Sequence, residues 1–184
     1  MTGTIIFVVA VVVIGAILVG MYNGLVRLRN QVRNAWSQID VQLKRRHDLI
    51  PNLLETVKGY AGHEKQTLEN VVKARSQAQS ATGVEAQSMA EGALSSALGR
   101  LMVVVEQYPD LKANQNFLAL QEELASTENK ISFSRQHYND SAMVMNNKVE
   151  SFPSNIIAGM FGFKREPFFE IQDEAEREAP KVQF

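Results

Sequence analysis

The feature that most constrains this chain is an uncharged, apolar run at its start. Residues 1–26 contain no Asp, Glu, Lys or Arg, and the stretch from Thr4 to Tyr22 is almost wholly apolar. As a helix, residues 4–22 would be about 28 Å long, close to the roughly 30 Å hydrocarbon core of a bilayer. A lone segment in lipid must satisfy its own backbone hydrogen bonds, which a helix does. The sequence therefore predicts a transmembrane helix at 4–22, preceded by a short extracytoplasmic N-terminus at 1–3.

A cleaved signal peptide is the competing interpretation of the same run. Such a peptide has a basic region before the apolar core and a small-x-small cleavage site after it. Residues 1–3 carry no basic side chain, and the residues after Tyr22 run directly into an amphipathic pattern. Both features favour a retained, single-pass helix.

Basic residues flank the C-terminal side of the predicted span. Arg27, Arg29 and Arg33 follow it closely, whereas only the terminal amine precedes it. By the positive-inside rule, the N-terminus points outward and the C-terminal domain is cytoplasmic. Because the three arginines come just below the span, we expect them to contact anionic lipid headgroups.

Composition excludes several other classes of protein. Nineteen Lys and Arg residues against 20 Asp and Glu residues give a net charge of −1, so we expect no nucleic-acid partner. Without cysteine, the chain has no disulfide scaffold, thiolate metal site or cysteine nucleophile. Five prolines and 11 glycines also disfavour a turn-dense β-sandwich or barrel.

Beyond residue 22 the apolar residues recur at helical spacing, which predicts an all-α fold. We interpret the pattern as an antiparallel four-helix bundle at 23–150 that continues the membrane helix. A loop is expected at 80–83 from its small residues, and Pro109 should end a helix while Asp110 caps the next. Four helices would return the following segment to the membrane-proximal end.

Pro51 is the ambiguous point, because the apolar phase continues straight across it. A single kinked helix over 25–79 would be about 80 Å long, beside a third helix of only about 36 Å. A break near 46–48, with Pro51 in the first turn of a new helix, gives lengths that can pack antiparallel. We therefore favour the break.

Two polar groups have structural explanations. Lys44, Arg45 and Arg46 are expected at the C-terminal end of the first bundle helix, where cations offset the helix dipole. Glu128 and Arg135 fall at heptad positions that should face the bundle interior, as part of a polar layer or flank that sets register.

The C-terminal tail at 151–184 differs in character from the bundle. Six of the nine phenylalanines lie there, among glycines and prolines that interrupt long helices. Phe161, Phe163, Phe168 and Phe169 are too apolar to remain solvated, so we identify them as interaction residues. They pack on their own bundle, bury against a neighbouring subunit or enter the lipid interface. Packing on the same chain is favoured, and self-association comes next.

No residue pattern points to catalysis or to a metal. His63-Glu64 begins a zincin-like motif, but residue 67, where the second histidine would stand, is Thr67. His137 and Asp140 have a metal-compatible spacing without a second pair to complete a site. The sequence also lacks a glycine-rich phosphate loop and a Gly-x-Ser-x-Gly elbow. We expect no catalytic residue, no cofactor and no bound metal.

Several segments resemble the LemA family of bacterial membrane proteins. In chain order they are residues 22–64, LQEELASTENKISFSRQHYND, SFPSNIIAGMFGF, FFEI and EREAPKV. The resemblance implies an N-terminal membrane helix and an antiparallel helical bundle. It implies little chemistry, because the family has no established enzymatic activity. Some relatives are associated with the formation of magnetosomes, which are intracellular membrane organelles.

Three functions fit these observations. The leading hypothesis is a non-enzymatic, single-pass protein of the bacterial inner membrane whose cytoplasmic bundle acts as a scaffold or adaptor in membrane or envelope organisation. Its partners would be the lipid bilayer, copies of itself and an unidentified membrane or envelope protein. The alternatives are a membrane-shaping, coat-like protein and an accessory subunit of a membrane protease or transporter.

Overall fold

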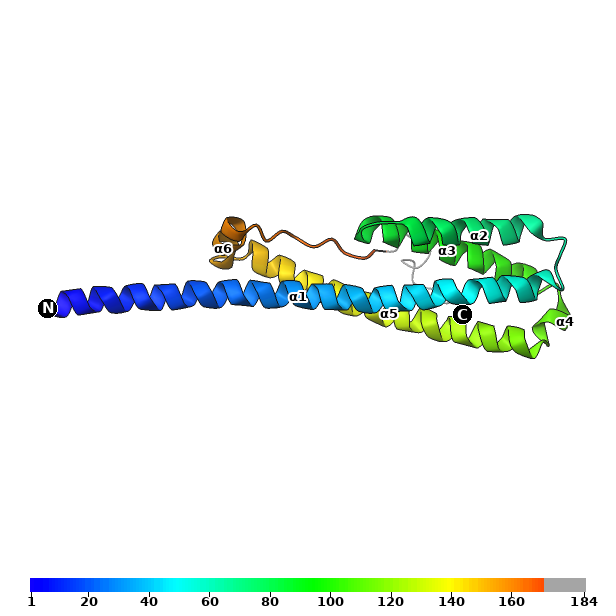
Figure 1. Ribbon diagram of the computed structural model, residues 1–184, viewed down its shortest axis with the longest axis horizontal. Coiled ribbons are helices and arrows are strands. Elements are labelled where there is room, and N and C mark those ends of the chain that lie inside the picture. Colours follow the sequence, from blue (N-terminus) through cyan, green and yellow to red (C-terminus); the bar gives the residue numbers. More distant parts are fainter. Residues whose placement is uncertain (171–184) are drawn as a thin grey trace, which may run out of the picture. The chain divides into compact units, whose positions relative to one another are not determined.

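The computed structural model describes residues 1–170, which form helices and connections without a strand. The helices are α1 (Thr2–Lys58), α2 (Lys65–Ser80), α3 (Val84–Val105), α4 (Pro109–Lys112), α5 (Gln115–Glu150) and α6 (Ser154–Phe161) (Figure 1). The predicted all-α class with an N-terminal apolar helix is therefore confirmed. The described chain divides into two compact units: the first comprises 1–39 and 134–167, and the second comprises 40–133 and 168–170.

The predicted helix break near residues 46–48 is wrong, because α1 is uninterrupted to Lys58 and contains Pro51 in its interior. A proline lacks the N–H that would bond the carbonyl four residues earlier, which here belongs to His47. Arg75 Nε from α2 donates a hydrogen bond to that carbonyl oxygen at 2.7 Å. A tertiary contact thus replaces the missing helical hydrogen bond, which an argument from helix lengths could not foresee.

The other helix boundaries follow local chemistry. Residues 59–64 separate α1 from α2, so the alternative single helix over 25–79 is not formed either. The loop between α2 and α3 ends at Gly83, whose φ of 87° favours glycine. The cap predicted at Asp110 is wrong. Asn114 caps α5 instead, because its Oδ1 accepts the backbone N–H of Phe117 at 3.1 Å.

The second unit is built around one hydrophobic core. Figure 1 shows α2 and α3 alongside the later part of α1 and the first part of α5. The largest buried side chains of this core are Ile50, Leu53, Val57, Leu94, Leu101, Leu111 and Phe117. The apolar stripes that predicted the helices are therefore the faces that these segments bury.

The first unit combines residues 1–39 of α1 with the end of α5, α6 and a strap, which we define as residues 162–167. Asn146 of α5 makes two hydrogen bonds to the strap. Its Nδ2 donates to the Glu166 carbonyl oxygen at 2.9 Å, and its Oδ1 accepts from the Glu166 N–H at 2.8 Å. The Tyr138 hydroxyl donates to the Pro167 carbonyl at 2.8 Å. These bonds satisfy backbone groups of the strap that no helix or sheet would pair.

Candidate membrane interface

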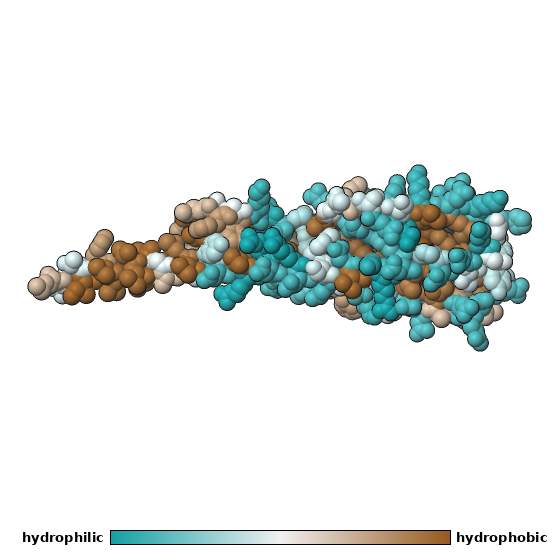
Figure 2. Space-filling view, viewed as in Figure 1, coloured by the Kyte–Doolittle hydropathy of each residue, from teal (hydrophilic) through white to brown (hydrophobic). Residues whose placement is uncertain are grey.

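The apolar stretch of α1 has no protein cover. Its large side chains from Ile5 to Val19 are between 44% and 69% exposed. None of its most apolar window is buried, and the helix is long and apolar enough to cross a membrane. Figure 2 shows the stretch as a mostly brown surface with a few paler patches. An apolar surface of this length is stabilised by lipid and not by water.

α3 is also long and apolar enough to cross a membrane. Its Leu94 and Leu101 are fully buried in the core of the second unit, and its Glu91 makes a buried ion pair. The hydropathy of α3 is therefore explained by its place in a helical core.

The three predicted headgroup arginines lie on α1 after the apolar stretch. Arg27 and Arg33 are exposed, so their guanidinium groups are accessible. Arg29 is half-buried, and its guanidinium carbon lies 5.0 Å from the ring centroid of Phe163. A cation over an aromatic face is attracted by the ring quadrupole. Arg29 therefore also holds the C-terminal segment against α1.

Tyr22, the last residue of the predicted span, meets the same segment. Its ring centroid lies 4.7 Å from that of Phe161 and 5.8 Å from that of Phe163, with tilted and edge geometries. Phe163 is 7% exposed, whereas Phe161 is 57% exposed. We call Tyr22, Arg29, Phe161 and Phe163 the aromatic clamp. The clamp places the start of the tail beside the end of the apolar stretch.

The four predicted interaction phenylalanines do not form one cluster. Phe161 and Phe163 belong to the first unit, whereas Phe168 and Phe169 belong to the second. Phe169 is 2% exposed and Phe168 is half-buried. Phe163 and Phe169 are thus covered by their own chain, and Phe161 keeps the most exposed ring of the four. The rest of the tail, 171–184, lies outside the described residues.

Sequence reasoning missed a buried ionic cluster in the second unit. Arg46 was assigned to a helix end, but its side chain and those of His47 and Glu91 are buried. Arg46 Nη1 donates to Glu91 Oε2 at 3.3 Å, and His47 Nε2 lies 2.8 Å from Glu91 Oε1. Ser95 Oγ accepts from Arg46 Nη2 at 2.7 Å, and Gln87 Nε2 donates to Glu91 Oε1 at 3.0 Å. Both carboxylate oxygens are therefore paired.

The position of Arg46 in the apolar repeat of the sequence could have predicted that it is buried. Arg46 falls in the apolar phase of α1, between the buried Leu43 and Ile50. Glu128, expected in the interior, is half-exposed and reaches Arg46 Nε only at an ion-pair distance of 3.5 Å. Desolvation of buried charges offsets much of their mutual attraction, so the pairing keeps Arg46 and Glu91 from being buried alone more than it adds stability.

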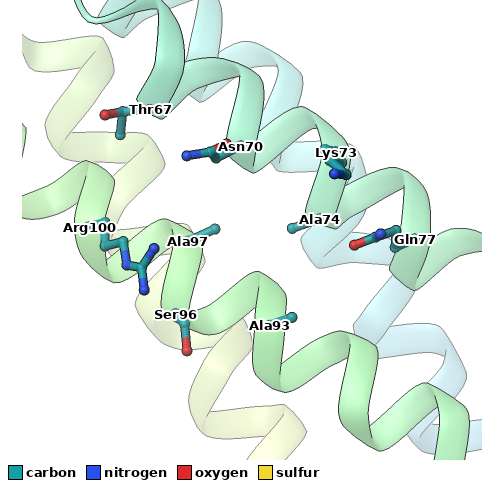
Figure 3. A pocket seen from close by; sticks show the side chains of 9 residues that line it. All are labelled: Thr67, Asn70, Lys73, Ala74, Gln77, Ala93, Ser96, Ala97 and Arg100. Atoms are coloured by element: carbon teal, nitrogen blue, oxygen red, sulfur yellow. The ribbon is translucent and has the colours of Figure 1, made fainter.

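Two hollows open on the surface of the second unit. A cavity of about 370 Å³ lies between α2 and α3 (Figure 3). Its lining residues are Thr67, Asn70, Lys73, Ala74 and Gln77 of α2 with Ala93, Ser96, Ala97 and Arg100 of α3. None of these nine described side chains is a carboxylate or a histidine, so the lining offers no acid–base pair. Within residues 1–170, no group of three or more His, Asp or Glu side chains could hold a metal ion.

The larger hollow, of about 770 Å³, runs between the end of α1 and α2, and we call it the α1–α2 groove. Leu54, Leu68 and Val72 supply its apolar lining. Lysines and glutamates line it as well, including Lys58 and Glu69. An exposed apolar floor with a polar rim is typical of surfaces on which another protein packs.

Comparison with known proteins identifies relatives of this chain. The model of the LemA family matches residues 35–184. Protein LemA of Metamycoplasma hominis is 31% identical, over 83% of this chain and 70% of that protein. Magnetosome protein MamQ 2 of Paramagnetospirillum magneticum is 27% identical, over 90% of this chain and 71% of that protein. Together with the uncovered stretch of α1, these similarities indicate a membrane-associated helical protein.

Proposed function

The chain belongs to the LemA family, and from that premise we propose that it is a non-enzymatic, single-pass membrane scaffold or adaptor. In this proposal α1 crosses the bacterial inner membrane with its N-terminus outside. The bundle is cytoplasmic and acts in membrane or envelope organisation. Its partners are the lipid bilayer, further copies of the chain and another membrane or envelope protein.

The observation that carries the proposal is the continuity of α1. The helix that begins with the uncovered apolar stretch also supplies Leu25 and Ile39 to the first unit and Ile50 and Leu53 to the second. The apolar stretch and residues of both units therefore lie on one helix. Such continuity suits a protein that holds partners at a membrane, and it favours the scaffold over a tethered enzyme.

The α1–α2 groove supports the adaptor role. Val72 is 54% exposed there, and the lysines and glutamates around it supply both signs of charge. A partner helix with an apolar stripe and charged flanks matches that surface. The relatives named magnetosome proteins also support a role in membrane organisation.

The test is gentle solubilisation of the native membrane, followed by sizing and mass spectrometry of what stays bound to the full chain. We expect a stable assembly that contains the chain and at least one other membrane or envelope protein. Val72→Glu, which places a charge in the groove, should release that protein. Val103→Glu is the matched control, because Val103 is a 67% exposed valine of α3 outside the groove lining.

The two alternative functions predict different results. Stoichiometric recovery of one protease or transporter would support the accessory-subunit hypothesis instead. Deformation of liposomes by the purified chain alone would support the coat-like hypothesis. Recovery of the same proteins with Val72→Glu as with the parent chain would overturn the role of the groove.

A further inference from the structure

α6 leaves a row of large apolar side chains exposed. Ile157 and Ala158 are buried in the first unit, whereas Ile156 and Met160 are 54% and 73% exposed. These two residues are four positions apart and so lie along one side of the helix. Phe152, just before α6, is 80% exposed, and α6 itself contains no charged residue. An uncharged row of this kind needs an apolar cover.

The neighbours of α6 identify that cover. Phe161, the last residue of α6, packs against Tyr22, which directly follows the uncovered stretch of α1. In that stretch Leu18 and Val19 are still 44% and 60% exposed. Figure 2 shows the pale brown surface of α6 adjoining the brown surface of α1. Lipid that covers the end of the stretch therefore also reaches α6.

The charges near α6 fit the headgroup region of a bilayer. Arg27 on α1, Lys148 at the end of α5 and Lys164 just after α6 are all exposed. Arg165 pairs with Glu150 at 3.0 Å, which neutralises that glutamate. Exposed cations beside an apolar row match an anionic lipid surface, and Tyr22 is a residue type enriched at this depth.

We infer that α6 is a second membrane contact that lies in the plane of the interface. The row of Ile156 and Met160, together with the exposed rings of Phe152 and Phe161, enters the boundary between headgroups and acyl chains. The aromatic clamp and the double hydrogen bond of Asn146 to the strap hold α6 in that place. The inference rests on the proposed membrane anchoring by α1, and it names lipid as the occupant of this face.

The chain lacks cysteine, so single-cysteine variants of the full chain can carry one environment-sensitive fluorophore each. Met160→Cys probes α6, and Met89→Cys on α3 is the matched control because Met89 is a 62% exposed methionine of the second unit. Both variants are reconstituted into phosphatidylcholine–phosphatidylglycerol vesicles that contain nitroxide lipids. We expect blue-shifted emission and several-fold stronger nitroxide quenching at residue 160 than at residue 89. Vesicle flotation in alkaline carbonate tests the anchoring by α1 separately.

Flotation and quenching together distinguish failure of the inference from failure of the anchoring by α1. Flotation with equal, weak quenching at residues 160 and 89 would overturn the inference while leaving the anchor intact. A blue shift at residue 160 that grows with protein density, without nitroxide quenching, would assign the face to a second copy and also overturn it. Loss of flotation would overturn both the anchoring and the inference. A helical circular dichroism spectrum matching that of the parent chain confirms that each labelled variant is folded.

Discussion

Among the single substitutions considered, Glu91→Gln should destabilise the folded chain most. Glu91 is buried with Arg46 and His47, and its two carboxylate oxygens accept hydrogen bonds from Arg46 and Gln87. Glu91→Gln removes the buried carboxylate and leaves the Arg46 charge with only the half-exposed Glu128 as an ion-pair partner. Loss of one member of a buried ion pair typically costs about 3–5 kcal/mol. Chemical unfolding of the detergent-solubilised full chain, followed by circular dichroism, measures this loss.

The control for Glu91 is the exposed ion pair of Arg45 with Glu123. Arg45 Nη2 lies 2.7 Å from Glu123 Oε1, but the two side chains are 49% and 41% exposed. Glu123→Gln should therefore cost less than about 1 kcal/mol. Equal losses for the two variants would show that burial of the cluster contributes nothing.

The stability of the folded chain should depend on pH through the hydroxyl of Tyr138. Burial, with a smaller contribution from the charge of Glu166, raises the pKa of Tyr138 from 10.0 to about 12. The folded state thus holds the phenolic proton more tightly than the unfolded state does. The resulting stability is fully present below pH 10 and is lost as the pH rises through about 12.

Ultraviolet titration of tyrosinate checks this expectation. The parent chain should contain a component near pH 12 that is missing from Tyr138→Phe. The hydrogen bond from Tyr138 to the Pro167 carbonyl should also be lost over this pH range, because the ionised oxygen can no longer donate, whereas the two bonds from Asn146 to the strap remain. If Tyr138→Phe removes a component near the ordinary pKa of tyrosine instead, the side chain is not shielded as the structure shows.

At the scale of elements, the unbroken α1 depends on one long-range hydrogen bond. Arg75→Met removes the hydrogen-bond donor to the His47 carbonyl oxygen. Pro51 cannot supply a donor to this oxygen, because proline has no backbone N–H. Leaving that acceptor without a partner should destabilise the chain by about 1–3 kcal/mol. Unfolding of the full chain in detergent measures the effect.

A double-mutant cycle isolates the proline as the cause. Pro51→Ala restores the helical N–H that bonds the same carbonyl. In that background Arg75→Met should cost clearly less than it does in the parent chain. The same cost in both backgrounds would mean that Arg75 acts through packing and that α1 tolerates Pro51 for another reason.

Orientation is a property of the whole molecule. The basic residues Arg27, Arg29 and Arg33 follow the apolar stretch, so the C-terminal side should remain in the cytoplasm. A reporter active only outside the cytoplasm, fused after Phe184, should be silent. A reporter active only in the cytoplasm, fused at the same residue, should give a full signal. The opposite pattern would reverse the proposed topology.

The apolar anchor and the all-α class were predictable, because each depends on residues close together in the chain. An uninterrupted apolar run calls for lipid and for helical hydrogen bonds, whatever follows it. Apolar residues at helical spacing likewise define a buried face without reference to a partner. The loop that ends at Gly83 belongs to the same category, since glycine adopts the positive φ found there at little cost.

The remaining features depend on partners far away in the sequence. Helix α1 continues through Pro51 because Arg75, 28 positions beyond His47, supplies the missing donor. Arg46 is buried because Glu91, 45 positions away, neutralises it. The sequence by itself determined an apolar anchor and a set of helices. Tertiary structure alone decided where α1 ends and which charges are buried. Burying an unpaired carbonyl or charge costs free energy, so such a group is buried only where another part of the chain supplies a hydrogen-bond or ion-pair partner.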